Sequence, residues 1–398
     1  MDTALPFSTS GGSFLRDYVN YARAICDAPE EYHVGVALAL FGAAVADRIA
    51  IPRGPVPIPP MLWVILVGRS RHDRKTTAIN IGTSIASKTA LSQRLIQGTA
   101  SAEGLQRLLA EYPTRLIAYP EFGRFLEDTT GGSYATKTRR LMMELADPIQ
   151  GEFKHDLAKG TKTKITNPRL GVLGGCATTF LQYKTKREDW EGGFFGRSIL
   201  IYARRDRNDK MQAPDPHVEE SLTRRLEFIT TAQIPRCGGF TRAADDMLHQ
   251  WDKINDAKST QTNDLVSTFY GGMCTTAWKL AMIYSLDRGF ANQDGWLIDE
   301  ASAYHAIMFC EHIWRPSFEK LAEKIVVDND TVTLYRSEQV VESNGAAGAS
   351  KSDIARATRL TEKRVTEAVN SLLLARRIYK AHRPDGTEVY LHETFKQE

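Results

Sequence analysis

The sequence has few cysteines, and their placement argues against two kinds of site. The chain of 398 residues contains five, all far apart and without a CxxC pair: Cys26, Cys176, Cys237, Cys274 and Cys310. An odd, scattered set argues against a disulfide framework and against a cysteine zinc site. The nine histidines form neither an HExxH motif nor an HxH pair. The sequence therefore gives no sign of a structural metal site.

Long apolar runs and targeting signals are also lacking. The longest apolar run without a charge, residues 34–46 (VGVALALFGAAVA), is shorter than the about 20 residues that span a bilayer. The first residues, MDTALPFSTSGGSF, contain neither the basic region nor the apolar core of a signal peptide. We therefore expect a soluble, cytoplasmic protein that has no membrane partner.

Neither sign of charge is in large excess. Lysine and arginine number 51 and aspartate and glutamate 48, which gives a net charge of +3. With 42% hydrophobic and 25% charged residues, the composition is that of a globular protein and argues against global disorder. Because the chain exceeds the roughly 100–200 residues of one typical domain, we expect two or three.

The hydrophobic pattern predicts an α/β core between residues 61 and 210. Residues 61–67 (MLWVILV) form a continuous apolar run, which is typical of a strand buried on both faces of a parallel sheet. Similar strands and helical stretches then alternate, which predicts a mostly parallel sheet. The further strands are expected at 115–119, 169–174 and 197–203, and the helices at 76–95, 101–112 and 134–146.

The segments on either side of this core have different patterns. Residues 1–60 contain two helical stretches and a Pro-rich connector at 51–60. After Arg205 the pattern is helical throughout, which predicts an all-α subdomain over 211–342. The stretch ESNGAAGAS at 342–350 is small and polar, so we expect a flexible linker before a last module at 343–398.

The polar stretch 67–77 (VGRSRHDRKTT) lies between a predicted buried strand and a predicted helix. In a P-loop, backbone N–H groups at a helix N-terminus hold phosphates, a lysine reaches the β- and γ-phosphates, and a hydroxyl binds Mg²⁺. Gly68 would open the loop, and Lys75 and Thr76 would supply the amine and the hydroxyl, with Thr77 beside them. Arg74 stands where the motif has its second glycine, and the loop is one residue longer. The alternative is a basic loop that opens a helix.

Polar residues after the later strands extend this pattern. Glu121 stands where a P-loop ATPase carries an acid that polarises the attacking water or holds Mg²⁺; otherwise it caps a helix. Thr178 or Thr179 would hold the γ-phosphate or the water, and the alternative is an N-cap of the next helix. Arg197 follows a glycine-rich turn and would be an arginine finger that reaches a neighbouring subunit; otherwise it is a salt-bridged surface residue.

The order of these pieces resembles a family of P-loop ATPases from phages, plasmids and integrated elements that are replicative-helicase-like and primase-associated. The resemblance covers roughly residues 14–290 and rests on the strings LWVILVGRSRHDRKTTA, PEFGRFL, NPRLGVLGGCATT, GGFFGRSIL and TTAWKLAMIYSL. It implies a RecA/AAA+-like fold and an oligomeric ATPase, a ring and most simply a hexamer, that uses ATP and Mg²⁺ on DNA. It also implies nucleotide binding by Lys75 and Thr76, an acidic role for Glu121, and action of Arg197 on a neighbouring subunit.

The first candidate DNA contact is the basic stretch 151–169, which has five basic against two acidic residues. Gly160 is the expected tip of a hairpin, which a ring helicase would project into its pore to bind single-stranded DNA. The candidate contacts are Lys154, Lys159, Lys162 and Lys164. The alternative is a solvated surface hairpin.

The second candidate is the C-terminal module, which has the pattern of a winged helix-turn-helix. A helix at 352–357, a helix at 362–375 and an Asp385-Gly386 hairpin turn follow one another. Between residues 351 and 383 there are nine basic and three acidic residues. Lys363 and Arg364 at the start of the second helix would enter the major groove of duplex DNA. The alternative is a winged helix that contacts proteins.

Three functions remain open at this point. The first is a helicase-like ATPase in the DNA replication of a mobile genetic element. The second is a DNA-binding initiator or regulator whose degenerate P-loop hydrolyses little or no ATP. A third class, an ATPase switch in transposition or defence, shares the same residues.

Overall fold

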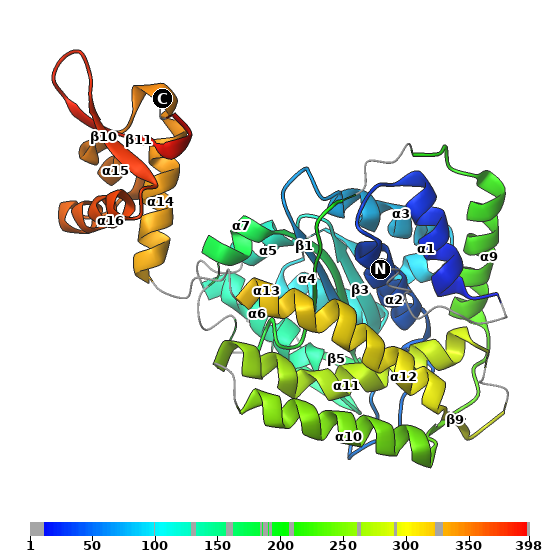
Figure 1. Cartoon of the computed structure of the whole chain (residues 1–398). Helices are drawn as coiled ribbons and strands as arrows, with labels where there is room; N and C mark the ends of the chain where they lie inside the picture. Colours follow the sequence, from blue (N-terminus) through cyan, green and yellow to red (C-terminus); the bar gives the residue numbers. More distant parts are fainter. Residues whose placement is uncertain are drawn as a thin grey trace. The chain divides into compact units, whose positions relative to one another are not determined.

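Five parallel strands form the sheet at the centre of the fold, in the order β2-β3-β6-β1-β7 (Figure 1). They are β1 (Trp63–Gly68), β2 (Leu95–Gln97), β3 (Thr114–Tyr119), β6 (Arg169–Ala177) and β7 (Ile199–Tyr202). The computed structural model describes residues 12–98, 100–128, 133–156, 162–183, 185, 190, 193–206, 211–260, 264–289, 293–322 and 329–395. The chain divides into two compact units, Met1–Ala322 and Glu323–Glu398.

The predicted parallel sheet is confirmed, and β1 is buried along its whole length between β6 and β7. Its register places Gly68 beside Ala177 of β6, and the register of β3 places Tyr119 beside Gly174. The carboxyl ends of these strands therefore meet at one edge of the sheet. The three-residue strand β2 was not predicted, because so short a segment carries no periodic signal.

The helix α2 (Glu30–Val45) is the most buried helix of the first unit and packs against the sheet. At Gly35 a side-chain carbon would come within 2.4 Å of Ile201 and 3.1 Å of Val64, so the helix lies directly on β7 and β1. The last carbonyls of a helix need partners from outside it. Arg94 donates to the carbonyls of Ala43 and Ala44, and Arg169 to that of Ala46. These cations also suit the negative end of the helix dipole.

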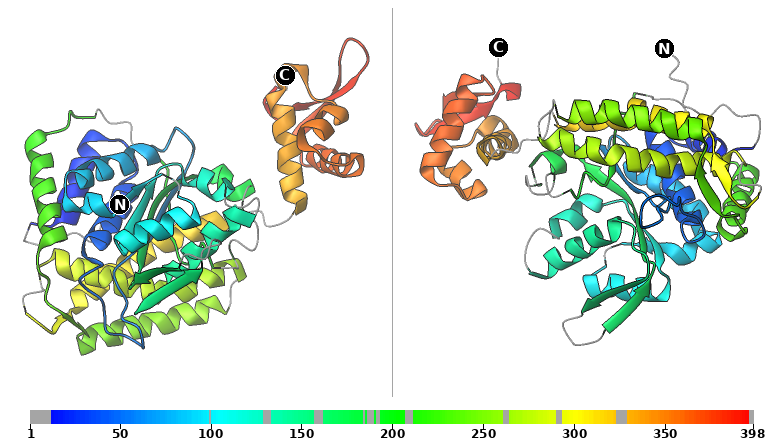
Figure 2. Two further views of the ribbon diagram at one scale, coloured as in Figure 1. Left: turned by 180° about the vertical axis from the view of Figure 1, so that it is seen from behind. Right: turned by 90° about the horizontal axis from the view of Figure 1, so that it is seen from below.

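The remaining helices of the first unit pack around the sheet (Figures 1 and 2). Those that precede β7 in the chain are α1 (Phe14–Ile25), α3 (Lys75–Ser87), α4 (Ala102–Glu111), α5 (Phe122–Asp128), α6 (Ser133–Ala146) and α7 (Thr178–Tyr183). Those that follow are α9 (Pro216–Thr231), α10 (Arg242–Ser259), α11 (Asp264–Asp287), α12 (Glu300–Phe309) and α13 (Arg315–Ala322), with one π-helical turn, Cys310–Trp314, joining the last two.

The prediction of an all-α segment after Arg205 is wrong in one respect. Two short strands, β8 (Cys237–Phe240) and β9 (Trp296–Ile298), pair in parallel between the long helices. They have four and three residues, and β8 contains two glycines, so neither shows the alternation or the apolar run by which a strand is recognised.

The second unit contains three helices and one antiparallel hairpin. These are α14 (Asn329–Ser343), α15 (Lys351–Thr358), α16 (Glu362–Leu374), β10 (Ile378–His382) and β11 (Glu388–His392). The linker predicted at 342–350 is wrong. The end of α14 and a 3-10 turn occupy this stretch, and Ala349 is fully buried and exchanges two backbone hydrogen bonds with Tyr390. Small residues occupy this stretch because its backbone packs closely against the strand that contains Tyr390.

A buried charge cluster ties α14 to the rest of this unit. The Glu338 side chain is 4% exposed, accepts a hydrogen bond of 2.7 Å from Nε of Arg377, and lies 3.3 Å from Nε2 of His392. Because α14, the segment after α16 and the end of β11 all meet at this carboxylate, α14 belongs to the second unit rather than to a connector.

Glu338→Gln is therefore expected to destabilise the second unit by about 2 kcal/mol, since it removes a charged hydrogen-bond acceptor from a buried site. All six tryptophans, from Trp63 to Trp314, lie in the first unit. In urea unfolding, part of the circular-dichroism signal should therefore be lost at a lower urea concentration. The midpoint of the transition seen by tryptophan fluorescence should not change. Glu342→Gln, one turn further and exposed, is the matched control and should change neither signal.

Candidate functional site

The candidate site lies where the strand connections change direction. After β1 the chain runs to β2 at one margin of the sheet, whereas after β6 it runs to β7 on the other side of β1. In open α/β sheets, ligands bind in the crevice at the carboxyl ends of strands at such a switch point. The ends of β1 and β6 lie side by side at this switch point.

The loop after β1 opens α3 with an uncapped N-terminus. Arg74 is the N-cap residue, has left-handed backbone angles (φ 54°, ψ 25°) and makes no side-chain capping hydrogen bond. The amide groups of the first turn have no partners within the helix, and with the helix dipole they favour an anion. Left-handed angles explain why glycine is the usual residue here, and a non-glycine residue is disfavoured by roughly 1–2 kcal/mol.

Lys75, the first residue of α3, turns back under this loop. Its side-chain amine donates to the carbonyls of Gly68 and Arg69, both at 3.0 Å, and the residue is 8% exposed. Burial lowers the pKa of Lys75, and the negative charges of Asp73 and Glu121 oppose that shift. The amine therefore lies between the end of β1 and the start of α3, within reach of the charge on Glu121.

Asp73 determines the shape of the loop, and it is a site residue that the sequence did not reveal. Its carboxylate is fully buried and accepts hydrogen bonds from the backbone N–H groups of Arg69 at 2.6 Å and Arg205 at 3.2 Å. Burial acts to raise the pKa of Asp73, but these bonds and one to His72 hold it below its ordinary value. A lone acid within a strongly basic loop was the available signal.

The loop is also fixed from outside by two residues near the start of α2. Asp27 is buried and forms ion pairs with Nε of Arg74 at 3.3 Å and with the guanidinium of Arg205. The hydroxyl of Tyr32 lies 2.6 Å from the carbonyl of Val67 and 2.9 Å from that of Ala203, and can donate to either. The ends of β1 and β7 and the loop are therefore joined through polar side chains.

Several predicted site residues meet at this same edge. Thr76 and Thr77 are exposed on the first turn of α3. Thr178 is the first residue of α7, and its buried hydroxyl has no hydrogen-bond partner among the described residues. Thr179 beside it is exposed. Glu121 follows β3 with its side chain 58% exposed, 3.8 Å from Arg124.

Arg197 is the predicted site residue that lies elsewhere. It precedes β7, whose first residue, Ile199, pairs with Val64 near the amino end of β1. Its guanidinium contacts Asp147 at 2.9 Å and donates to the carbonyl of Gly193 at 3.1 Å. Arg197 is thus a salt-bridged residue at the opposite edge of the sheet from Lys75, and it cannot reach the loop of its own chain.

The predicted basic hairpin is present as β4 (Glu152–Asp156) paired with β5 (Lys162–Thr166), and it projects from the first unit in the right-hand view of Figure 2. Lys154 and Lys164 are opposite each other in its register, and Lys164 contacts Glu152 at 3.1 Å. Lys159 and Gly160 lie outside the described residues, and Lys162 is placed only as the first residue of β5.

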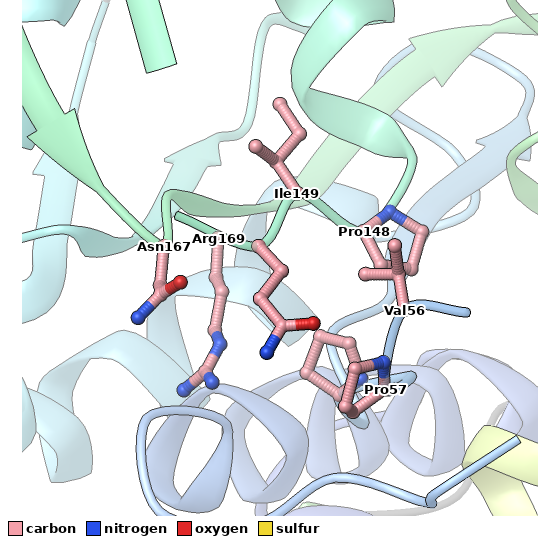
Figure 3. Close-up of a pocket in the computed structure, with 8 residues that line it drawn as sticks. Val56, Pro57, Pro148, Ile149, Asn167 and Arg169 are labelled. Atoms are coloured by element: carbon pink, nitrogen blue, oxygen red, sulfur yellow. The ribbon is translucent and has the colours of Figure 1, made fainter. Parts of the chain in front are cut away.

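The base of this hairpin lies against the Pro-rich connector and encloses a cavity of about 110 Å³ (Figure 3). Pro57 and Pro148 line it, and Arg169 and Asn167 close one side. Arg169 was counted among the basic residues of the hairpin, but it is the first residue of β6. Its guanidinium donates a hydrogen bond to the carbonyl of Ala46 at the end of α2. This cavity lies at the amino edge of the sheet and takes no part in the site.

In the second unit, Lys363 and Arg364 are exposed in the first turn of α16. Neither forms an ion pair with another described residue. Three of the nine basic residues counted between 351 and 383 form ion pairs within the unit: Arg377 with Glu338, Lys380 with Glu388 and Arg383 with Asp353. The other six lie in or beside α15 and α16.

Comparisons with known proteins add no family to these observations. Neither a search of protein-family models nor a search of curated protein sequences finds a match to the chain. Within the described ranges, no three His, Cys, Asp or Glu side chains gather as metal ligands would. None of the helices in the described part of the chain combines the length and the apolar character needed to cross a bilayer.

Gly68 offers a direct test of the loop geometry. A side-chain carbon there would come within 2.3 Å of the Tyr32 hydroxyl and 2.8 Å of the Asp73 carboxylate. Gly68→Ala should therefore lower the free energy of unfolding by about 1–3 kcal/mol, measured by urea unfolding with tryptophan fluorescence. Gly271→Ala in α11, where nothing lies within 4 Å, should leave stability unchanged or raise it by up to about 1 kcal/mol. Equal effects of the two variants would contradict the packing described for Gly68.

Proposed function

We propose that the chain is a P-loop ATPase that binds ATP with Mg²⁺ at the loop 68–77 and acts on DNA, as a helicase-like replication protein of a mobile genetic element. The observation that carries the proposal is the placement of Lys75. Its buried amine lies under the uncapped start of α3, at the carboxyl end of the interior strand β1. Backbone amides, a helix dipole and an amine at one point are what a phosphate chain requires.

The charge around this point supports a polyphosphate ligand. Lys75 donates to two neutral carbonyls, and a phosphate in their place would add the attraction between opposite charges to the hydrogen bond. Arg69, Arg71 and Arg74 are exposed in the same loop. A phosphate chain at the start of α3 would therefore be surrounded by positive charge on the solvent side and by amides below.

The residues at this edge include oxygen ligands for the Mg²⁺ ion that accompanies a nucleotide. Thr76 offers a hydroxyl and Glu121 a carboxylate, both exposed, and oxygen ligands of these kinds are what Mg²⁺ prefers while it keeps several waters. The ion would neutralise charge on the β- and γ-phosphates. Glu121 would orient the attacking water, and the unpartnered hydroxyl of Thr178 would hold that water or the γ-phosphate.

The position of Arg197 is the reason to propose that several copies of the chain assemble. Because this residue lies at the edge of the sheet opposite Lys75, a role in hydrolysis requires the nucleotide of a second copy. We propose a ring, most simply of six subunits, in which Arg197 leaves Asp147 to reach the neighbouring site. Asp147 is 64% exposed, and exposed pairs of this kind contribute about 0–1 kcal/mol, so the exchange is easy. A primase is the partner that the sequence resemblance suggests.

DNA binding is proposed for the second unit. Its two helices α15 and α16, followed by the hairpin β10–β11, have the order of a winged helix-turn-helix. Helix α16 would enter the major groove with Lys363 and Arg364, and the hairpin would follow the backbone. The lysines of the β4–β5 hairpin are the second proposed contact, with single-stranded DNA.

The second candidate function is a DNA-binding initiator or regulator that uses nucleotide as a ligand and hydrolyses little of it. Two observations favour it. Arg74 occupies the left-handed position that glycine usually fills, and Glu121 stands alone and largely exposed, so it is not held rigidly in one orientation. The nucleotide site is common to both candidates, and turnover distinguishes them.

Lys75→Ala should weaken ATP binding by about 1.5–3 kcal/mol, or roughly tenfold to hundredfold, because the variant cannot form a charged hydrogen bond to phosphate. Calorimetric titration of ATP into the protein in the presence of Mg²⁺ measures this affinity. Lys88→Ala, at the other end of α3, is the matched control. Unchanged affinity of Lys75→Ala would exclude the P-loop. Glu121→Gln should keep binding and abolish hydrolysis, and hydrolysis at the wild-type rate in that variant would make Glu121 structural.

Replacement of both Lys363 and Arg364 by alanine should weaken duplex DNA binding and reduce the slope of log affinity against log salt by about 1 for each phosphate that is no longer neutralised. Fluorescence anisotropy at several salt concentrations gives both quantities. A double variant with the same charge change in α10, Lys253→Ala with Lys258→Ala, should leave the slope unchanged. An identical slope in the two double variants would assign the second unit to protein contacts.

A further inference from the structure

A surface hollow of about 370 Å³ lies between α1 and the segment that leads into α9. Ala24 and Ile25 of α1 line one side, and Gln212 and Ala213 line the other, with Asn20 at the rim. The backbone N–H of Gln212 donates to the carbonyl of Ala24 at 2.8 Å, which holds the two walls together. Its size falls within the range of small-molecule sites, which are mostly apolar with a few polar groups.

The α1 wall of this hollow continues into the segment that holds the loop after β1. Ala24 precedes Asp27 by three residues, a span of at most about 11 Å. Asp27 pairs with Arg74 at the start of α3 and with Arg205. The α1 wall of the hollow is therefore three residues along the chain from an ion pair made with the N-terminus of α3.

The chemistry of the hollow differs from that of the loop. The carboxylates of Asp17, which pairs with Arg225 at 2.7 Å, and Asp215 lie at its margin, and the residues that line the hollow include no lysine or arginine to bind phosphate. Its walls are apolar, and Asn20 and Gln212 contribute amide groups. An amide presents one donor and one acceptor side by side, which matches the N6 and N7 edge of adenine. The ligand class that fits is a neutral, flat, hydrogen-bonding group rather than a second anion.

We infer that this hollow receives the nucleoside part of the nucleotide whose phosphates bind at the start of α3, and that Asn20 and Gln212 recognise the base. The inference rests on the proposed nucleotide binding and adds the position and the recognition of the base. The phosphates and the nucleoside then occupy two neighbouring sites of opposite character, one basic and one apolar with an acidic margin.

The test separates these two parts with two probes, ATP and inorganic tripolyphosphate, each titrated calorimetrically with Mg²⁺ into the full chain. Combined Asn20→Ala and Gln212→Ala should weaken ATP about tenfold and leave tripolyphosphate unchanged. Ala213→Trp, in an exposed segment where a large side chain does not disturb the core, should fill the hollow and have the same selective effect. Gln233→Ala removes an amide elsewhere on the surface and is the control, with no effect on either probe.

The outcomes distinguish this inference from the function on which it rests. Unchanged ATP affinity in both hollow variants, together with weakened binding in Lys75→Ala, would overturn the base site and leave the phosphate site standing. Equal weakening of ATP and tripolyphosphate in the hollow variants would also overturn it, because the hollow would then act only through the loop. Failure of the wild-type chain to bind either probe would overturn the proposed function and this inference together.

Discussion

The buried carboxylate of Asp73 is the constraint on which the candidate site depends. A charge enclosed by protein must be met by hydrogen bonds, and here two of the donors are backbone amides from segments far apart in the chain, Arg69 and Arg205. That requirement bends the loop back on the end of β1 and joins it to the end of β7. Gly68 follows from the same constraint, because the carboxylate and the Tyr32 hydroxyl occupy the space of a side chain. Lys75 is then left with its amine beneath the turn.

Because the strands are parallel, different side chains gather at the two ends of the sheet. All five strands are parallel, so their carboxyl ends collect the loop, Thr178 and Glu121, while their amino ends collect Arg197 and Asp147. A side chain at one edge cannot serve the other edge in the same subunit. Under the proposed function, this polarity makes the ATPase a property of adjacent subunits, whereas nucleotide binding remains a property of one chain.

The sequence was informative where structure is local or continuous. The buried strands β1, β3, β6 and β7 were predicted because each contains a run of apolar residues, and the loop 68–77 because its residues are consecutive. The strands β2 and β9 have three residues each and β8 contains two glycines, so none of them contains such a run. The packing of Ala349 against Tyr390, the ion pair of Arg197 with Asp147 and the role of Asp73 all depend on partners between 41 and 132 residues away. No periodicity encodes such pairs, so the structure was needed to find them.

The position of β1 between β6 and β7 has a consequence for biosynthesis. Both of its neighbours come late in the chain, since β6 begins at Arg169 and β7 at Ile199. At a ribosomal rate of about 5–20 residues per second, this strand waits on the order of 10 seconds for its first partner. Throughout that interval a wholly apolar segment has two unpaired edges, a state prone to aggregation. Early packing of α2 against β1 would shield one face, which gives the N-terminal helices a role in protecting the nascent chain.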